Sequence, residues 1–270
     1  MKLKSGEVIL FCVNYNSYDK VAEYLQSLDN AALQAACNVT VIVADNSDPV
    51  EKLEFIPEKI QVHHVVTHQN LGYLGGVTYA IRERNIDLSQ YDYIIISNVD
   101  VFVCDEFFCQ LSDADISDDV GCIAPSIYSL AMCYDRNPQR IRRIPKLRLW
   151  LLRVMYTFPI LYTIHLKFFS SRKYENHTYE KMEIYSPHGS FMIFTKKFAP
   201  FLQTFVFPVF LFGEELYFAE NLRICGLSVI YDPSIKVKDY DHVNTGQLKN
   251  SVRMKWNREA LKMIYLKYYK

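Results

Sequence analysis

The sequence predicts an α/β domain with a mostly parallel central sheet, a basic helical insertion and a C-terminal helix. Two observations lead to this prediction. Short runs rich in valine and isoleucine alternate with segments whose apolar residues recur at helical spacing. The chain has 270 residues, of which 50% are hydrophobic and 14% aromatic, and this is enough to bury one sizeable core. Strands separated by helices usually pair in parallel through right-handed crossovers, so we expect a mostly parallel sheet.

The first strand is predicted at residues 7–14, where the apolar run VILFCV lies between Glu7 and Asn14. A helix is expected next at residues 17–28, because Ser17 is a favoured N-terminal cap and apolar residues at helical spacing follow it. Residues 38–47, NVTVIVADNS, predict the second strand from their valine and isoleucine content.

The alternation of strand and helix continues in the next part of the chain. Residues 60–66, IQVHHVV, predict a third strand. Residues 72–85 predict a helix that glycines open, and residues 91–100, with three consecutive isoleucines, predict a fourth strand.

Polar residues follow each of these predicted strands. In chain order they are Asn14 and Asn16, Asp45 and Asn46, Asn70 and Gly72, and Asn98 and Asp100. Each pair alone is also typical of a turn or a helix cap. Because ligands of parallel sheets bind beyond the carboxyl ends of the strands, four such endings indicate one shared site. Asp100 lies between two apolar runs, and a buried carboxylate needs a partner.

Composition excludes several classes of protein. Thirty basic and thirty acidic residues cancel, which argues against a general binder of polyanions. Seven cysteines without a CxxC pair favour reduced thiols and a cytoplasmic protein. The apolar run near the N-terminus is too short for a signal core, and no apolar run reaches the length of a membrane span. The segment NLGYLGG has neither the Walker nor the dinucleotide-binding glycine spacing.

Six motifs occur in a characteristic order: VNYNS, VADNSD, NLGYLGG, SNVDVFV, PHGSFMIF and FLFGEELYFAENLRICG. In this order they resemble the family-2 inverting nucleotide-sugar glycosyltransferases of the GT-A fold, especially bacterial enzymes that build envelope polysaccharides. The resemblance covers residues 7–242. It implies a GT-A (Rossmann-like) domain at residues 1–247, followed by a basic helical tail at 248–270.

The resemblance implies a divalent cation, Mn²⁺ or Mg²⁺, that bridges the two phosphates of the donor. Asn98 and Asp100 match the family's DxD-like element, with asparagine in place of the first aspartate, and Asp100 is the expected metal ligand. A further ligand is expected after the last strand. Residue type favours His242 and spacing favours Asp239, so both stay open; each could also belong to an exposed edge strand and turn.

The same resemblance assigns the catalytic acids. Glu215 matches the base that takes the proton from the acceptor hydroxyl, and Glu214 is expected to bind sugar hydroxyls. The alternative is that two acids in the first turn of a helix only complement its dipole.

Donor contacts are implied around the early strands and one later turn. The residues expected to bind the donor are Val13, Asn14, Tyr15, Asn16, Asp45, Asn70, Gly72, Tyr73, Gly75, Gly76, Asn98, Gly189 and Ser190. His188 could contact the sugar or only pack beside this turn.

The insertion at residues 136–173 holds ten Lys or Arg and no Asp or Glu, beside Trp150 and leucines. This composition suits an anionic membrane surface, although two core helices with solvated basic residues would look similar. Pro159 should divide the segment into two helices. No recognised module supports nucleic-acid binding.

The sequence therefore predicts a metal-dependent inverting glycosyltransferase that is peripheral on the inner face of a bacterial plasma membrane. The expected partners are a nucleotide-sugar donor and a glycan or lipid-linked glycan acceptor. Two alternatives stay open: a nucleotide-sugar or glycan-binding protein without turnover, and a sugar nucleotidyltransferase. The oligomeric state is not predicted.

Overall fold

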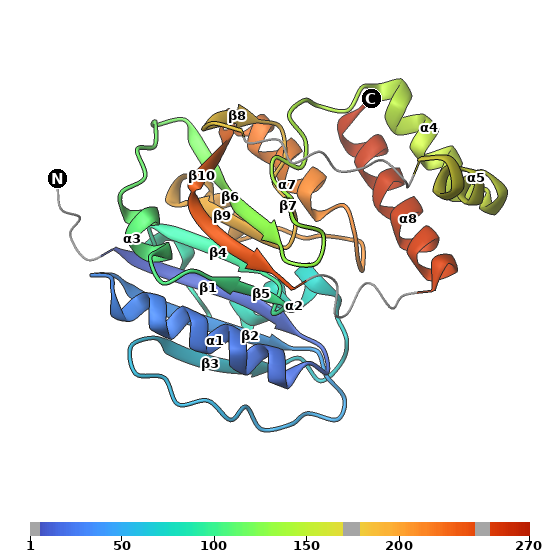
Figure 1. The fold of residues 1–270 in the computed structure, drawn as a ribbon. Coiled ribbons are helices and arrows are strands. Elements are labelled where there is room, and N and C mark those ends of the chain that lie inside the picture. Colours follow the sequence, from blue (N-terminus) through green and yellow to red (C-terminus); the bar gives the residue numbers. More distant parts are fainter. Residues whose placement is uncertain (1–5, 170–178, 241–248) are drawn as a thin grey trace.

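The computed structural model describes residues 6–169, 179–240 and 249–270. Within these residues ten strands form one sheet, whose main path runs β3-β2-β1-β4-β9-β6-β10-β5, with β7 beside β6 and β8 beside β10 (Figure 1). The strands are β1 (Glu7–Asn14), β2 (Asn38–Asp45), β3 (Gln61–Val66), β4 (Tyr93–Ser97), β5 (Val101–Val103), β6 (Val120–Ser129), β7 (Tyr134–Asp135), β8 (Met182–Ile184), β9 (Phe191–Thr195) and β10 (Ser228–Asp239). The α/β class predicted from the sequence is confirmed.

Helices cover both faces of this sheet. They are α1 (Tyr18–Leu33), α2 (Tyr73–Glu83), α3 (Phe107–Ser112), α4 (Lys146–Thr157), α5 (Pro159–Phe169), α6 (Ala199–Leu202), α7 (Glu214–Ile224) and α8 (Asn250–Tyr268), with short 3-10 turns η1 (Leu88–Gln90) and η2 (Lys196–Phe198). Alternate residues of β1 point to opposite faces. Ile9 and Phe11 pack in the cluster that includes α2 and α7, whereas Leu10 and Cys12 pack in the cluster that includes α1 and α3.

The first half of the sheet is parallel, as the sequence predicted. Strands β3, β2, β1 and β4 pair in parallel, and both faces of β1 are buried, which explains its continuous apolar sequence. The register places Asn14 opposite Asp45 and Asp45 opposite Val66. The polar ends of these strands therefore meet at one edge of the sheet.

The second half of the sheet is mixed. β9 pairs antiparallel with both β4 and β6, β6 pairs in parallel with β10, and β5 pairs antiparallel with β10. The last pairing aligns Asp239 with Val101, and the backbone N–H of Tyr240 donates to the carbonyl of Asp100 at 3.1 Å. Asp100 and Asp239 are thereby brought to the same edge, although they are far apart in sequence.

The basic insertion forms two helices, α4 and α5, on either side of Phe158, as Pro159 predicted. Helix α8 packs along α4, with the Arg153 guanidinium 4.5 Å from the centre of the Tyr265 ring (Figure 1). In the part of the chain that the structure describes, no helix combines the length and the apolar character needed to cross a lipid bilayer. The predicted domain boundary at residue 247 lies outside the described residues and stays a prediction.

Candidate active site

A cavity of about 440 Å³ opens at the polar edge of the sheet. The residues that line it come from the ends of β1, β2, β4 and β10, from the start of α2, from the segment after β7, and from the segments before β9 and α7. They are Val13, Tyr15, Asn46, Asn70, Gly72, Tyr73, Asn98, Val99, Asp100, Gln139, His188, Gly189, Ser190, Phe210, Leu211, Phe212, Glu214, Glu215 and Asp239.

Most of the residues predicted as a site meet in this cavity. The predicted residues on its wall are Val13, Tyr15, Asn70, Gly72, Tyr73, Asn98, Asp100, Gly189, Ser190, Glu214, Glu215 and Asp239. Five others, Asn14, Asn16, Asp45, Gly75 and Gly76, are not among the residues that line it. His242 lies outside the described residues. The functional roles of all these residues stay predictions.

Asp45 is buried and surrounded by protein donors. Its carboxylate accepts hydrogen bonds from Asn14 Nδ2 at 3.1 Å and from the Tyr18 hydroxyl at 2.7 Å, and it lies 2.7 Å from His64 Nε2. Burial alone would raise the pKa of this carboxyl, but the hydrogen bonds from His64, Ser47 and Tyr18 lower the pKa to about 2. Asp45 and Asn14 therefore hold the ends of β1 and β2 together, and a contact with the donor would need one of these bonds to be shared.

Gly72 fits a close approach of two segments at the cavity wall. Its φ is 75°, and an added Cβ would collide with the backbone carbonyl of Phe210. Asn46 Nδ2 donates to the Gly72 carbonyl at 3.0 Å, and the Gly72 N–H donates to Asn70 Oδ1 at 3.0 Å. The glycine therefore allows α2 to begin beside the segment that leads into α7.

The small-residue turn before β9 is held by a buried asparagine. Asn137 Oδ1 accepts from the His188 N–H at 2.8 Å, and Asn137 Nδ2 donates to the Pro125 carbonyl at 2.8 Å. The His188 ring nitrogen Nδ1 lies 2.8 Å from the Ser190 hydroxyl oxygen. His188 thus contacts its own turn while also lining the cavity.

Glu214 and Glu215 begin α7 directly after Gly213, whose φ is 85°. Glu214 is buried, and its Oε1 accepts the backbone N–H of Phe212 at 2.9 Å. Burial, together with the negative charge of Glu215, raises the pKa of Glu214 to about 8. Burial also raises the pKa of Glu215, although the hydrogen bond from its own backbone N–H and then the positive charge of Arg140 oppose this rise. Burial thus raises the pKa of both neighbouring carboxyls, and Glu214 favours its protonated form near neutral pH.

The cavity wall also offers the carboxylate oxygens of two aspartates, and hard divalent cations prefer such ligands. Asp100 and Asp239 are buried there, and Asn98 lies on the same wall. Arg136 Nε is 3.1 Å from Asp239 Oδ2, so part of the charge of Asp239 is already balanced. Among the described residues no three His, Cys, Asp or Glu side chains form a metal cluster. Two buried carboxylates on one cavity wall nevertheless have the chemistry to hold a cation if a diphosphate supplied further oxygen atoms.

Sequence reasoning missed several residues of the wall. They are Asn46, Val99, Gln139, Phe210, Leu211 and Phe212. Asn46 follows the second predicted strand. The apolar sequence FVFPVFLFG before Glu214 is the sequence signal that could have indicated the three residues from Phe210 to Phe212. Gln139 carried no comparable signal.

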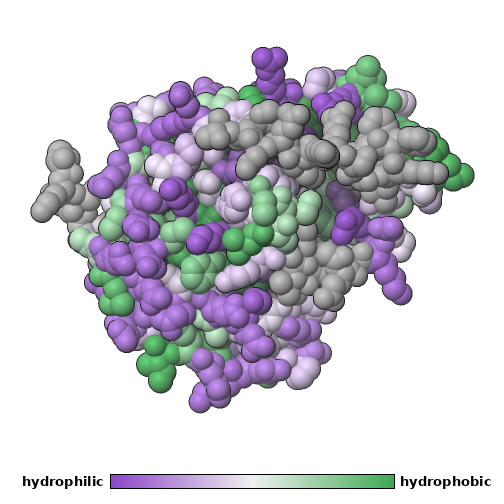
Figure 2. Space-filling view, in the orientation of Figure 1, coloured by the Kyte–Doolittle hydropathy of each residue, from purple (hydrophilic) through white to green (hydrophobic). Residues whose placement is uncertain are grey.

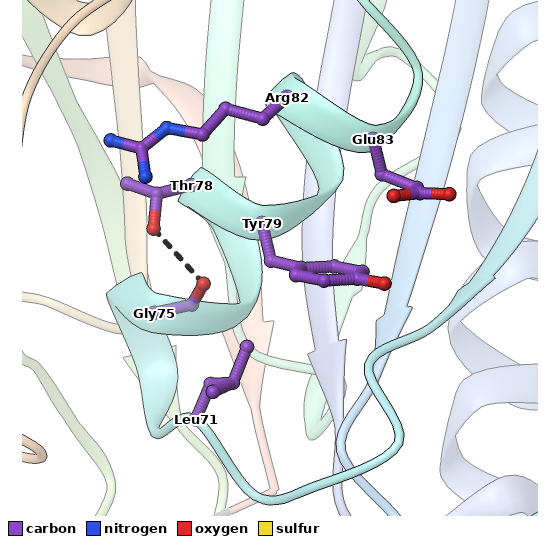
Figure 3. A pocket seen from close by; sticks show the side chains of 6 residues that line it. All are labelled: Leu71, Gly75, Thr78, Tyr79, Arg82 and Glu83. Atoms are coloured by element: carbon purple, nitrogen blue, oxygen red, sulfur yellow. Dashed lines mark hydrogen bonds between the residues drawn. The ribbon is translucent and has the colours of Figure 1, made fainter.

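A second hollow of about 540 Å³ lies along α2 (Figure 3). It is lined by Leu71, Gly75, Thr78, Tyr79, Arg82 and Glu83. The Thr78 hydroxyl donates to the carbonyl of Gly75 in its own helix at 3.0 Å, as the dashed line in Figure 3 shows. Gly75, predicted as a donor contact, therefore lines this hollow rather than the cavity with the carboxylates.

Comparisons with known proteins show the family and the fold of this chain. The family model described as Glycosyl transferase family 2 matches residues 10–199. No curated protein matches the chain. A crystal structure of GalNAc-T7 with UDP, GalNAc and Mn²⁺ is similar in fold, with a TM-score of 0.54, 12% identity and 93% of this chain covered. This chain spans only 47% of that protein.

Two further solved structures show weaker similarity. The mannosyltransferase PcManGT from Pyrobaculum calidifontis, in complex with GDP-Man and Mn²⁺, has a TM-score of 0.47 and 13% identity, over 87% of this chain and 57% of its own. The catalytic domain of Drosophila beta1,4galactosyltransferase 7, in complex with xylobiose, has a TM-score of 0.46 and 11% identity, over 88% of this chain and 71% of its own. Scores below one half add nothing to the fold assignment.

Proposed function

Because the chain belongs to glycosyl transferase family 2, we propose that it moves one sugar, with inversion, from a nucleotide-sugar donor to a glycan acceptor. The observation that supports this proposal most is the placement of two kinds of acid around one cavity. Asp100 and Asp239 lie on its wall, and so do Glu214 and Glu215. The first pair suits a diphosphate with its cation, and the second suits an acceptor hydroxyl.

On the donor side, Asp100 and Asp239 would hold Mn²⁺ or Mg²⁺, with Asn98 beside them. Such a cation neutralises charge on the leaving diphosphate. Asn70, Gly72 and Tyr73, at the start of α2, would contact the nucleotide. Asn14 and Asp45 would position the donor site indirectly, since the hydrogen bond between them fixes the strand ends next to Tyr15 and Asn46.

On the acceptor side, Glu215 would accept the proton of the attacking hydroxyl. The hydroxyl oxygen forms a bond to the anomeric carbon while the bond from that carbon to the diphosphate oxygen breaks, which inverts the configuration. Glu215 suits this task because burial raises its pKa, which makes its carboxylate a stronger base, while its own backbone N–H and the positive charge of Arg140 still favour the ionised form. The protonated carboxyl of Glu214 can donate a hydrogen bond to a sugar oxygen.

The proposal also covers the acceptor, the pathway class and the place of action. We propose a lipid-linked glycan as the acceptor, synthesis of a bacterial surface polysaccharide as the pathway class, and action at the inner face of the plasma membrane. A binding protein without turnover and a sugar nucleotidyltransferase are the alternatives. They differ in products: a transferase slowly releases nucleoside diphosphate by donor hydrolysis, a nucleotidyltransferase releases pyrophosphate, and a binder releases neither.

Thermal-shift screening tests the proposal. The protein would be heated with UDP-, dTDP- and GDP-sugars, each with and without Mn²⁺, because a ligand that binds only the native state raises the unfolding temperature. UDP is a suitable first probe, since the similar GalNAc-T7 structure contains it with Mn²⁺. We expect one nucleotide class to stabilise the protein in the presence of Mn²⁺ and its sugar to be hydrolysed slowly. Stabilisation by no nucleotide would contradict the proposal.

A further inference from the structure

Helices α4 and α5 expose a set of large apolar side chains, here called the α4–α5 surface. Its members are Leu147, Trp150, Leu151, Phe158, Ile160, Leu161 and Ile164. Ile160 is 75% exposed and Leu147 is 68% exposed, although neighbouring Leu149 and Tyr162 are buried. Figure 2 shows hydrophobic side chains at the edge of the view where these two helices lie in Figure 1. Such a gathering marks an interaction site more often than scattered exposed residues do.

The basic residues around this surface fall into two groups. One group forms ion pairs and ring contacts within the protein. Arg143 is an example: its Nε lies 2.6 Å from Glu220 Oε1, and its guanidinium is 4.0 Å from the centre of the Tyr269 ring. Others, such as Arg142 and Arg148, are exposed. Residues 136–164 contain no acid, so nothing on these helices balances the exposed positive charge.

Helix α8 extends the same positive charge. It packs along α4 and exposes Lys255 and Lys262. The surface therefore combines exposed apolar side chains, including Trp150, with nearby positive charges. Proteins use both features to bind the interface of an anionic bilayer. Apolar side chains enter the boundary between headgroups and acyl chains, while cations contact lipid phosphates.

We propose that the α4–α5 surface docks on an anionic lipid bilayer, with its apolar side chains inserted at headgroup level. The position of this surface adds a location for the acceptor, and this part of the inference rests on the proposed function. The segment that leads into α4 lies beside the cavity, because the backbone N–H of Arg140 donates to the carbonyl of Ser186 at 3.2 Å, two residues before His188 on the cavity wall. Docking there would bring the acceptor side of the cavity towards the bilayer, where a lipid-linked glycan is held.

Co-sedimentation with vesicles tests the docking. The full chain would be mixed with phosphatidylcholine vesicles and with vesicles that also contain phosphatidylserine, at low and high salt. The test variant is Leu147→Ser/Leu151→Ser/Ile160→Ser, and the matched control is Leu33→Ser/Ile56→Ser/Ile224→Ser, which changes three exposed apolar residues elsewhere. We expect the test variant to lose roughly tenfold or more in binding to anionic vesicles, and the control to bind like the wild type.

A second variant examines the charge. Arg142→Glu/Arg148→Glu should weaken binding to anionic vesicles and leave thermal stability unchanged, because both side chains are exposed. Arg143 is unsuitable for this purpose, since its removal would leave the buried carboxylate of Glu220 with one ion pair fewer.

Three results would overturn the docking proposal. One is wild-type protein that stays in solution with anionic vesicles at low salt. Another is equal loss of binding in the test and control variants. A third is a concentration-dependent dimer, seen by gel filtration and lost in the test variant, because the surface would then be a contact between copies of this chain. Donor hydrolysis does not need vesicles, so its failure with intact vesicle binding would refute the proposed function alone.

Discussion

The phenol of Tyr73 donates a hydrogen bond to the backbone carbonyl of Gly189 at a distance of 3.2 Å. This bond joins the start of α2 to the turn before β9 across the cavity. Burial, and then the negative charge of Glu214, raises the pKa of Tyr73, so the phenol stays protonated and remains a donor at any physiological pH. The start of α2 and the turn before β9, which are both expected to contact the donor, are thus fixed to each other by one side chain.

Tyr73→Phe should therefore lower the free energy of unfolding by about 1 kcal/mol, as expected for one lost hydrogen bond. It should also weaken binding of the nucleotide identified in the thermal-shift screen, because the turn at Gly189 becomes less constrained. Urea unfolding and calorimetry measure the two effects. Tyr79→Phe, on the same helix but in the second hollow, is the control. Equal effects of the two substitutions would refute this role for Tyr73.

Glu214 should make the protein less stable as pH rises. Its pKa in the folded chain is about 8 against a usual value of 4.5, so the native state binds more protons than the unfolded state between these values. This contribution is fully present below about pH 4.5 and is lost as pH rises through about 8, at up to about 1.4 kcal/mol per pH unit. Glu214→Gln should flatten this dependence in denaturant unfolding at several pH values. An unchanged slope would contradict the raised pKa.

Arg140 should set the acidic side of the activity profile. Its positive charge favours ionised Glu215, and the base must be ionised to work. Arg140→Gln should shift the acid limb of turnover to higher pH, because the pKa of Glu215 would rise further. Arg142→Gln is the control because Arg142 is exposed. A profile that Arg140→Gln lowers uniformly without shifting would show that Arg140 does not act on the base.

Asp100 should control the effect of metal on the donor. Asp100→Asn removes one of the two carboxylates proposed to hold the cation, so Mn²⁺-dependent affinity for the nucleotide from the screen should fall about tenfold or more. Calorimetry with and without Mn²⁺ measures this. Asp105→Asn, an exposed acid a few residues on, should bind as the wild type does. Unchanged Mn²⁺ dependence in Asp100→Asn would remove Asp100 from the metal site.

The fold was predictable where one segment carries its own signal. The strand at residues 7–14 has the predicted bounds, because an apolar run between polar residues specifies a buried strand. The two helices around Pro159 follow from the missing N–H of proline. The antiparallel entry of β9 between β4 and β6 was not predictable, since a strand sequence does not name its partners.

The site was predictable in part for the same reason. Motif order placed Asp100, Glu214 and Glu215 among the expected site residues, and spacing added Asp239 as an alternative to His242. These four carboxylates line one cavity. The residue types of Asn14 and Asp45 could not reveal that their register places them opposite each other and lets them bond. Charge counting likewise could not reveal that Arg143 reaches Glu220, 77 residues further along the chain. Pairings between distant segments decide which polar residues face a ligand.

The most direct test of the account is the turnover of Glu215→Gln beside Glu214→Gln. Both variants would be assayed for release of nucleoside diphosphate from the nucleotide sugar found in the thermal-shift screen, and calorimetry would measure donor affinity. Loss of a general base should lower the turnover of Glu215→Gln by about 100-fold or more with donor affinity kept, while Glu214→Gln should lose less. Full turnover in Glu215→Gln, or an inactive Glu214→Gln beside an active Glu215→Gln, would contradict the assignment of Glu215 as the base.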